Sequence, residues 1–240
     1  MKNKKIYFDL HTHTVASGHG STDTISDLAK AAFENGLPFL GISDHAPATP
    51  GSATESYFRG LSGSPKERNG VRLFYGVELN IRDEQGNVDL PDDLLQSLDY
   101  SLISFHLPTF DDAGIEGNTN AMIKAMGHPK VKLLGHPDDS RFPLDYERLL
   151  SAAKEKNVFP ELNNASLMPD AYRIGAYENY KALLPLCERL SLPVVLSSDS
   201  HGKKHIGDFS FVLSLLEETA FPASLVLNFD SDGIRRIVSE

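Results

Sequence analysis

Cysteine pairs, long apolar runs and an excess of positive charge are all missing from this sequence. With a single cysteine, Cys187, the chain cannot form an internal disulfide, which suits a reducing compartment. No stretch approaches the roughly 18 apolar residues of a membrane span, and the opening segment MKNKKIYFDL has no apolar run of signal-peptide length. The formal net charge is −10, whereas surfaces that bind nucleic acid are normally basic. We therefore expect a cytoplasmic protein without a nucleic-acid or membrane partner.

The pattern of apolar and polar residues is typical of a single α/β domain spanning residues 1–240. Apolar β-type runs alternate with amphipathic helical stretches, which predicts βαβ units and a parallel sheet, and seven strands favour a barrel over an open sheet. The expected strands cover 5–10, 38–42, 71–81, 100–105, 131–134, 158–162 and 194–196. The expected helices cover 25–35, 91–98, 119–126, 146–156, 178–190 and 209–219, with a helical fragment at 232–238.

Two local signals refine this pattern. Thr24 and Asp27 have the spacing of a capping box at the start of the first helix, and Gly36 is expected to end it. Residues 46–70 are rich in Gly, Ser and Pro and are expected to form a long loop, which in a compact domain is usually functional or mobile.

Seven of the nine histidines stand at or just after the ends of predicted strands. They are His11, His13, His19, His45, His106, His136 and His201, joined by Glu78 late in the third strand and by Asp199 beside His201. The carboxyl ends of the strands in a parallel barrel open on one face, so these distant residues are expected to meet there. Imidazole and carboxylate ligands suit zinc, manganese or iron. The sequence therefore predicts a metal site at this face.

An ordinary hydrogen-bonded or surface role is the more common one for a single histidine near a strand end. That alternative weakens when seven histidines are expected at one face. Glu78 lies in an apolar segment, and a buried carboxylate is costly unless it is paired or binds a metal. His128 and His205 fall outside the pattern and are assigned ordinary roles.

The motifs FDLHTHTVAS, GVELNI, ISFHLP, LLGHP and SSDSH resemble those of the PHP metallohydrolases, named for polymerase and histidinol phosphatase, and within them the YcdX-like phosphatase branch. The resemblance runs from Phe8 to about His201 and fills nine ligand positions. It implies a distorted (β/α)7 TIM-like barrel that holds three divalent metal ions, often zinc, with manganese or iron as alternatives. By position, one metal takes His11, His13, Glu78 and Asp199, a second shares Glu78 and takes His106 and His136, and the third takes His19, His45 and His201.

This resemblance implies a phosphatase that hydrolyses phosphomonoesters of small molecules. Glu78, Asp199 and His201 are the expected catalytic residues. The hypothetical mechanism is attack on phosphorus by a hydroxide held between metals, which lower the pKa of water from about 15.7 to roughly 7. Three bound cations would also offset the acidic charge of the chain and attract a phosphate dianion.

Four further residues are candidates near the site, and three of them, Arg59, Asn164 and Arg173, are expected to bind the substrate. Arg59 in the 46–70 segment and Arg173 after the sixth strand could bind phosphate, although a plain surface role is an alternative for each. Asn163 and Asn164, in the segment ELNNAS, are expected near the site as supporting or substrate-binding residues, or simply as turn residues.

Several other functions remain open from the sequence alone. The first alternative is a histidinol-phosphate phosphatase, which would share the ligand set. The second is a 3′-5′ exonuclease, against which the acidic charge and the lack of a basic, aromatic-lined segment argue. The third is a metal-binding or metal-sensing protein without catalysis. The oligomeric state is also open, with a homo-oligomer as one alternative.

Overall fold

Parallel strands form the centre of the molecule, of which the computed structural model describes Met1 and residues 4–238. The strands are β1 (Phe8–Asp9), β2 (Phe39–Ile42), β3 (Glu67–Arg68), β4 (Val71–Tyr75), β5 (Glu78–Asn80), β6 (Ser101–Ser104), β7 (Val131–Leu134), β8 (Phe159–Asn163) and β9 (Val195–Ser197). They form one sheet in the order β1-β2-β4-β3 and a second in the order β5-β6-β7-β8-β9. The short β3 is antiparallel to β4, whereas the ladders from β5 to β9 are parallel.

Single parallel bridges join the two sheets just where their strands end. Thr12, after β1, bridges Ser200, after β9, and His45, after β2, bridges Glu78 at the start of β5. The strands therefore follow one another in a barrel-like succession that is distorted at these two points, and the expected α/β fold is confirmed. The bridges also bring the segments that carry the predicted ligands into direct contact.

Asn228 provides a further link between β1 and β9 near their other ends. Its buried side chain accepts a hydrogen bond from the Leu196 backbone N–H at 2.7 Å and donates to the Phe8 carbonyl at 2.9 Å. The side-chain amide thus supplies hydrogen bonds that a continuous ladder would otherwise make. In this way the C-terminal segment fixes the spacing of two strands that lead to the predicted metal site.

The expected strand at 71–81 is wrong as a single element, because the chain changes sheet within it. β4 pairs with β2 and β5 pairs with β6, and Gly76 lies at the crossing. A Cβ atom on Gly76 would lie 2.6 Å from the Tyr100 ring, so only glycine lets the backbone pass this ring without displacement. Tyr100 is itself held in place by donating to the Leu10 carbonyl at 2.6 Å. Sequence periodicity did not reveal the break, since both pieces are apolar.

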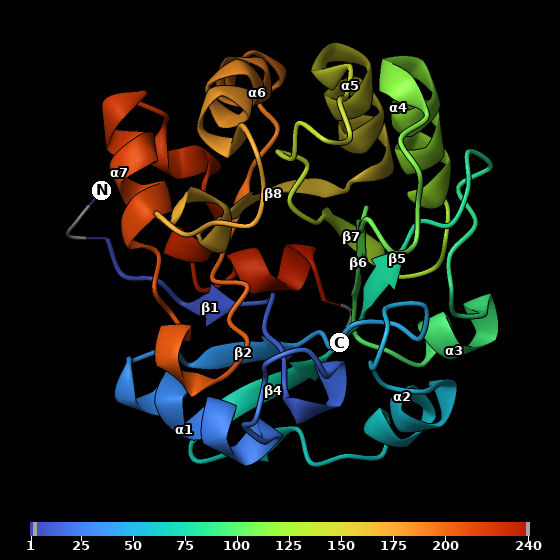
Figure 1. Cartoon of the computed structure of the whole chain (residues 1–240). Helices are drawn as coiled ribbons and strands as arrows, with labels where there is room; N and C mark the ends of the chain where they lie inside the picture. The colour runs from blue at the N-terminus through green and yellow to red at the C-terminus, as the bar shows by residue number, and fades with distance from the viewer. Residues whose placement is uncertain (2–3, 239–240) are drawn as a thin grey trace.

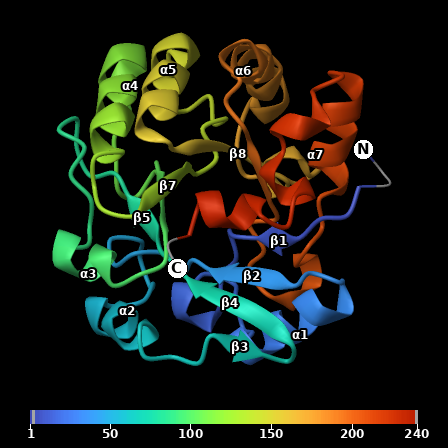
Figure 2. The ribbon, with the colours of Figure 1, turned by 180° about the vertical axis from the view of Figure 1, so that it is seen from behind.

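The helices cover the outside of the strands (Figure 1). They are α1 (Ile25–Glu34), α2 (Glu55–Leu61), α3 (Asp92–Gln96), α4 (Gly114–Ala125), α5 (Tyr146–Lys156), α6 (Ala176–Leu190) and α7 (Ser210–Glu218). In both ribbon views α4, α5 and α6 stand in a row above β7 and β8, whereas α1 and α2 lie in the lower half of the molecule with β4 (Figure 2). The predicted capping box at α1 is confirmed, since Thr24 and Asp27 each accept from the other's backbone N–H. Within the described part of the chain, no helix has both the length and the apolar character needed to cross a bilayer.

Three other expectations about secondary structure need correction. The supposed loop at 46–70 contains α2 and β3, and α2 forms because Phe58 and Leu61, one helical turn apart, are both buried. The helix expected to begin at residue 119 begins at Gly114, and the C-terminal fragment is a 3-10 turn over Gly233–Arg236.

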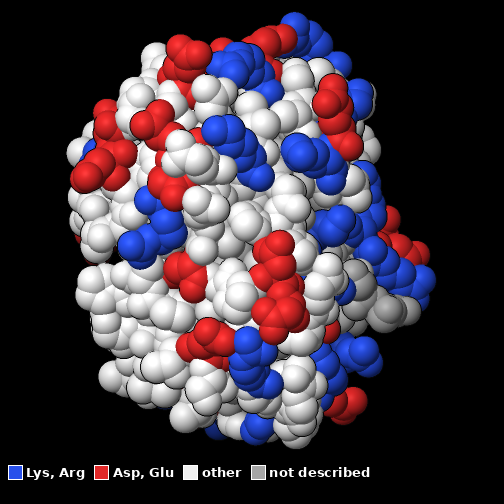
Figure 3. Space-filling view, turned by 90° about the vertical axis from the view of Figure 1, so that its right-hand side faces the viewer, with Lys and Arg blue, Asp and Glu red and all other residues white. Residues whose placement is uncertain are grey.

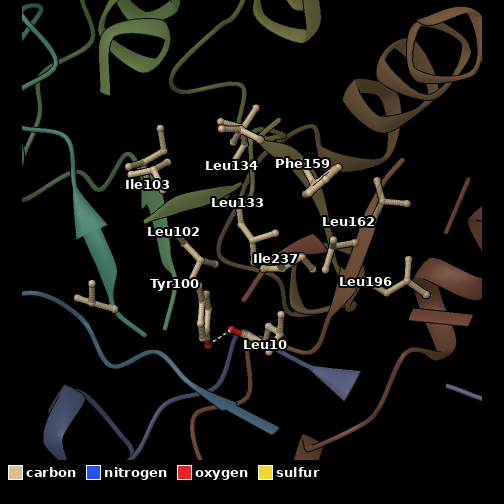
Figure 4. Packing of buried hydrophobic residues seen from close by; sticks show 14 of the residues in the cluster. Leu10, Tyr100, Leu102, Ile103, Leu133, Leu134, Phe159, Leu162, Leu196 and Ile237 are labelled. Atoms are coloured by element: carbon tan, nitrogen blue, oxygen red, sulfur yellow. Dashed lines mark hydrogen bonds between the residues drawn. The ribbon is translucent and has the colours of Figure 1, made fainter. Parts of the chain in front are cut away.

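Apolar side chains from neighbouring strands meet in the interior of the barrel-like ring (Figure 4). Leu102 of β6 and Leu133 of β7 lie beside Leu10, and Ile237 reaches them from the C-terminal segment. All of them are at most 1% exposed, and burying a side chain of this size contributes about 1.5–3 kcal/mol. This packing holds the strands in one register and so fixes the residues at their carboxyl ends.

Candidate metal centre

All nine predicted ligands gather at the face onto which the carboxyl ends of β1, β2, β6, β7 and β9 open. His11 and His13 follow β1, His45 follows β2, His106 follows β6, His136 follows β7, and Asp199 and His201 follow β9, while Glu78 begins β5 and His19 lies in the segment after β1. Chain segments almost 200 residues apart in sequence thus converge because parallel strands end at one face. The structure thus brings these nine side chains together, and their role as metal ligands stays a prediction.

Glu78 occupies the middle of the cluster and is completely buried. Its Oε2 lies 2.6 Å from His45 Nδ1, 3.3 Å from His11 Nε2 and 3.5 Å from His13 Nε2, and its Oε1 lies 2.8 Å from His136 Nε2 and 3.2 Å from His106 Nε2. One carboxylate thus faces five imidazoles. A carboxylate in this position has the geometry to share its oxygens between neighbouring cations.

Asp199 gathers a second part of the cluster around its Oδ1. This oxygen lies 3.0 Å from His13 Nε2, 3.4 Å from His11 Nε2 and 3.7 Å from His201 Nδ1. His201 Nε2 lies in turn 3.2 Å from His19 Nε2. Two nitrogens bound to one zinc at about 2.05 Å and a tetrahedral angle would be about 3.3 Å apart. The His19 and His201 rings therefore fit ligands of one shared cation.

The hydrogen bonds of three histidines turn their Nε2 lone pairs toward carboxylate oxygens. His11 donates from Nδ1 to Glu161 at 2.6 Å, and His106 donates from Nδ1 to Asn80 Oδ1 at 2.7 Å. His13 donates from Nδ1 to Ser17 Oγ at 3.0 Å, because the Ser17 hydroxyl is already donating to a carboxylate. In the neutral ring with the proton on Nδ1, Nε2 has only a lone pair left. A lone pair opposite a carboxylate is repulsive unless a cation or a second proton lies between them.

Buried polar atoms without hydrogen-bond partners mark the same place. Among the described residues they include His11 Nε2, both ring nitrogens of His45 and Glu78 Oε2. His45 Nδ1 approaches Glu78 Oε2 to 2.6 Å without forming an acceptable hydrogen bond. Four overlapping groups in the cluster place three potential ligand atoms within 4.8 Å of one another: His13, His45 and His201; His11, Glu78 and His136; His11, His13 and Asp199; and His45, Glu78 and His106. Buried groups left unpaired are costly, and these atoms have the geometry and chemistry of a divalent-metal site.

The electrostatics keep both carboxylates ionised in spite of their burial. Burial opposes the charge of Glu78, but His45, His11 and His106 outweigh it and hold the pKa of Glu78 well below its usual range. Burial likewise opposes the charge of Asp199, and His11 and Arg173 hold its pKa well below the usual range. Both groups are therefore negative ligands at neutral pH.

Most shifts on the histidines favour the neutral form that binds metals. Burial, with the neighbouring imidazoles His45 and His201, lowers the pKa of His19 to about 4, and burial with Arg173 lowers the pKa of His136 to about 4. His11 differs, because burial lowers its pKa but Glu161, Asp199 and Glu78 together raise it well above 6.5. Without bound metal, His11 thus keeps a second proton, and its positive charge stabilises the neighbouring carboxylates.

Glu161, in β8, is a functional residue that the sequence reasoning missed. It is completely buried, accepts from His11 Nδ1, from the His136 backbone N–H at 2.5 Å, and from the Ser197 hydroxyl. A carboxylate that holds the far nitrogen of a ligating histidine fixes the tautomer and raises the basicity of the ligand. The argument applied to Glu78, that a carboxylate inside an apolar strand needs a partner, would have identified Glu161 too.

Ser17 and Asp44 support His13 from behind. Ser17 Oγ donates to Asp44 Oδ1 at 2.6 Å, and Asp44 Oδ2 accepts from Thr14 Oγ1 at 2.9 Å and Tyr57 at 2.5 Å. All of these residues except Tyr57 are buried. The network fixes the His13 ring before any cation binds.

Two ligands occupy unusual backbone conformations. His136 has φ of 30° and Asp199 has φ of 53°, both on the left-handed side that side-chain-bearing residues rarely adopt. Such conformations cost about 1–3 kcal/mol and are found mainly at functional sites. Here they aim the two side chains from the strand ends toward the cluster.

The predicted substrate-binding residues divide into one that lies at the site and two that lie elsewhere. Arg173 donates to Asp199 Oδ2 at 2.8 Å and lines a cavity of about 600 Å³ over the cluster. Arg59 is an exposed residue of α2 that pairs with Glu55 and does not line this cavity. Asn164 accepts from the Phe211 backbone N–H at 2.9 Å, at the first turn of α7, so its side chain holds a helix instead of facing the cavity.

Asn163, the neighbour of Asn164, is the residue of this pair that reaches the cluster. Its Nδ2 donates to Glu161 Oε2 and to Asp199 Oδ2, both at 3.1 Å. Asn163 therefore supports two carboxylates of the centre. Outside the centre, His128 donates to Asp92 at 2.7 Å, in agreement with its ordinary role.

Comparison with known proteins places the chain among phosphatases. The model of the PHP domain matches residues 9–165. A "probable phosphatase" of Acetivibrio thermocellus is 40% identical over 224 residues, covering 93% of this chain and 91% of that protein. A "probable phosphatase" of Clostridium novyi is 38% identical over 226 residues, covering 94% of this chain and 91% of that protein.

Among solved structures, a histidinol phosphate phosphatase from Lactococcus lactis has a similar fold. Its TM-score is 0.63 at 15% identity, with 98% of this chain and 99% of that chain covered. That protein was solved in complex with zinc, L-histidinol and phosphate. At this level of identity the likeness supports the fold of the present chain.

Proposed function

The chain belongs to the PHP domain family and is a metal-dependent phosphatase, and we propose that it hydrolyses phosphomonoesters of small molecules at a centre of three divalent cations. The observation that carries the proposal is the convergence of seven histidines and Asp199 around the buried Glu78. Several of these ligand atoms, among them His11 Nε2 and Glu78 Oε2, are buried without a hydrogen-bond partner, and bound cations would supply the missing partners.

The proposed division of the ligands follows their contacts. His11, His13 and Asp199 would hold one cation together with Glu78 Oε2, and His106 and His136 would hold another with Glu78 Oε1, which lies near both of their Nε2 atoms. His19, His45 and His201 would hold the third, supported by the 3.2 Å separation of the His19 and His201 nitrogens. Zinc is the first choice for these nitrogen and oxygen ligands, as in the similarly folded phosphatase from Lactococcus lactis, with manganese and iron as alternatives.

Residues around the cluster provide positive charge for a phosphate ester and hold the proposed metal ligands in position. When bound, divalent cations supply the charge that polarises a phosphoryl oxygen and acidifies a coordinated water. Arg173 adds a fixed positive charge at the cavity, because Asp199 and Asp138 outweigh burial and raise the pKa of its guanidinium above the usual range. Its planar group suits recognition of phosphate oxygens. Glu161, Asn163 and Ser17 hold the ligands in place, so little reorganisation is needed when the substrate binds.

Histidinol phosphate is the second candidate substrate, favoured by the fold of the Lactococcus lactis enzyme. A nucleic-acid substrate is the weaker candidate. On the face seen in Figure 3, Lys and Arg side chains are interspersed with Asp and Glu, and the whole chain has a net charge of −10. This face therefore lacks the continuous basic surface that binds nucleic-acid backbones.

Removal and return of metal tests the proposed function. Phosphate release from a panel of phosphomonoesters, including histidinol phosphate, is measured before chelation, after chelation and after adding zinc or manganese. We expect activity to be lost on chelation and restored by metal. Full activity in a metal-free sample would contradict the proposal.

A further inference from the structure

Apolar side chains, among them Phe105, Leu107 and Phe142, line part of the cavity over the metal centre, although binding a phosphate does not require them. We propose that these side chains bind the leaving group and select phosphomonoesters whose alcohol carries a flat aromatic or heteroaromatic ring without positive charge. The inference rests on the proposed function, since the metal centre and Arg173 would hold the phosphoryl group in the same cavity. A cavity of about 600 Å³ is large enough for both parts of such a substrate.

The apolar wall begins one residue from a predicted metal ligand. Phe105 and Leu107 flank His106 in sequence, and all three line the cavity. Phe105 stacks on Phe142 with ring centroids 5.2 Å apart and planes inclined by 27°. Leu107 is 49% exposed, so its apolar surface is accessible to a ligand in the cavity. An apolar leaving group would cover this side chain as the phosphate reaches the centre.

Arg141 and Tyr172, which also line the cavity, offer a flat, polarisable surface. The guanidinium of Arg141 lies over the ring of Tyr172 at 4.1 Å, and Tyr172 is 70% exposed. Asp139 fixes Arg141 through hydrogen bonds from Nε at 3.0 Å and Nη2 at 2.6 Å. Planar guanidinium groups and tyrosine rings both stack on aromatic ligands. A ring bound in this cavity would therefore have both planar and apolar side chains available as partners.

Charge pairing in the cavity argues against a cationic leaving group. The carboxylates in the described lining are Asp139 and Asp199. Asp139 is paired with Arg141, and Asp199 is engaged by Arg173 and by the histidine cluster. An ammonium group on the substrate would thus lose water without gaining an unpaired carboxylate, which is unfavourable. An uncharged ring incurs no such loss.

Kinetics with substrates of similar alcohol leaving groups test the selection. kcat/KM is measured with the zinc-loaded enzyme for benzyl, propyl and 2-aminoethyl phosphate, so that the ring or the charge is the main difference. We expect benzyl phosphate to exceed propyl phosphate by about tenfold or more, and 2-aminoethyl phosphate to fall below propyl phosphate. Equal values for benzyl and propyl phosphate, or a preference for the amine, would overturn the proposal.

Two exposed tyrosines provide a matched pair of variants. Tyr172→Ala should reduce the benzyl-to-propyl ratio of kcat/KM several-fold, because one stacking surface is removed. Tyr177→Ala removes a 40% exposed ring on α6 that does not line this cavity, and should leave the ratio unchanged. An unchanged ratio in Tyr172→Ala would show that the leaving group does not stack on Tyr172.

Binding without turnover separates failure of this inference from failure of the proposed function. Benzylphosphonate and propylphosphonate cannot be hydrolysed, and their dissociation constants for the zinc-loaded protein are measured by calorimetry. If no phosphate ester is cleaved, the proposed function fails, yet a tenfold preference for benzylphosphonate would still support the apolar subsite. Equal affinity for the two phosphonates would overturn the subsite even in an active phosphatase.

Discussion

His11 Nδ1 donates a 2.6 Å hydrogen bond to Glu161, while Nε2 of the same ring faces Glu78 and Asp199 at 3.3 and 3.4 Å. All three carboxylates and the ring are buried. The bond to Glu161 therefore decides which nitrogen is available as a ligand and directs its lone pair to the centre of the cluster.

Removal of the Glu161 charge should weaken the metal centre without touching a ligand. Glu161→Gln cannot hold the His11 Nδ1–H in the same way, so we expect metal affinity to fall by about 10–100-fold. Competition with a chromophoric chelator measures this affinity, and Glu155→Gln, an exposed change on α5, is the control. Equal affinity in Glu161→Gln and wild type would show that Glu161 does not position His11.

Arg173 and Arg59 should behave differently although the sequence suggested both for phosphate. Arg173→Met should raise KM for a phosphate ester and the inhibition constant of inorganic phosphate about tenfold or more, since a hydrogen bond to a charged group is lost. Arg59→Met should change neither by more than about twofold, because its exposed ion pair with Glu55 contributes little. Steady-state kinetics with phosphate as inhibitor measure both constants. An unchanged KM in Arg173→Met would show that Arg173 does not bind the phosphate group of the substrate.

The change of sheet at Gly76 should be sensitive to a single methyl group. Gly76→Ala would bring a Cβ atom to 2.6 Å from the Tyr100 ring, so we expect a loss of about 1–3 kcal/mol in the free energy of unfolding. Gly63→Ala is the control, since its Cβ would meet only the Gly60 carbonyl oxygen at 3.9 Å. Urea unfolding of both variants measures the difference, and similar stability for the two would contradict the close approach.

The metal-free protein should show a pH dependence that comes from His136. Its folded pKa of about 4 lies below the ordinary value of 6.5, so the unfolded chain binds more protons between these values. The stabilising contribution is complete above about pH 6.5 and is lost as pH falls toward 4, by about 3 kcal/mol in all. The difference in unfolding free energy between wild type and His136→Gln should shrink over this window. Parallel curves for the two proteins would contradict the lowered pKa.

Much of the site could be predicted because its ligands follow a simple rule of position. Histidines and acids at the ends of apolar strands, such as His45 and His106, meet wherever parallel strands share a face. The ring of strands, the capping box at Thr24 and the position of Glu78 follow from local patterns in the same way. These features depend on residue type and spacing, which the sequence contains directly.

Other features depend on contacts between distant segments and were missed. Glu161 looks like a strand residue until β8 is placed beside His11, and Gly76 looks like part of one strand until Tyr100 is seen to pass it. Asn163 and Asn164 are identical in type, yet one reaches Asp199 and the other holds α7. Only the tertiary structure separates such neighbours.

The metal content of wild type and Glu78→Gln tests the central claim most directly. Elemental analysis of the wild-type protein should give about three divalent cations per chain, and Glu78→Gln should lose at least one of them together with most of its phosphatase activity. A Glu78→Gln protein that keeps its full complement of metal and full turnover would show that this carboxylate does not organise the centre.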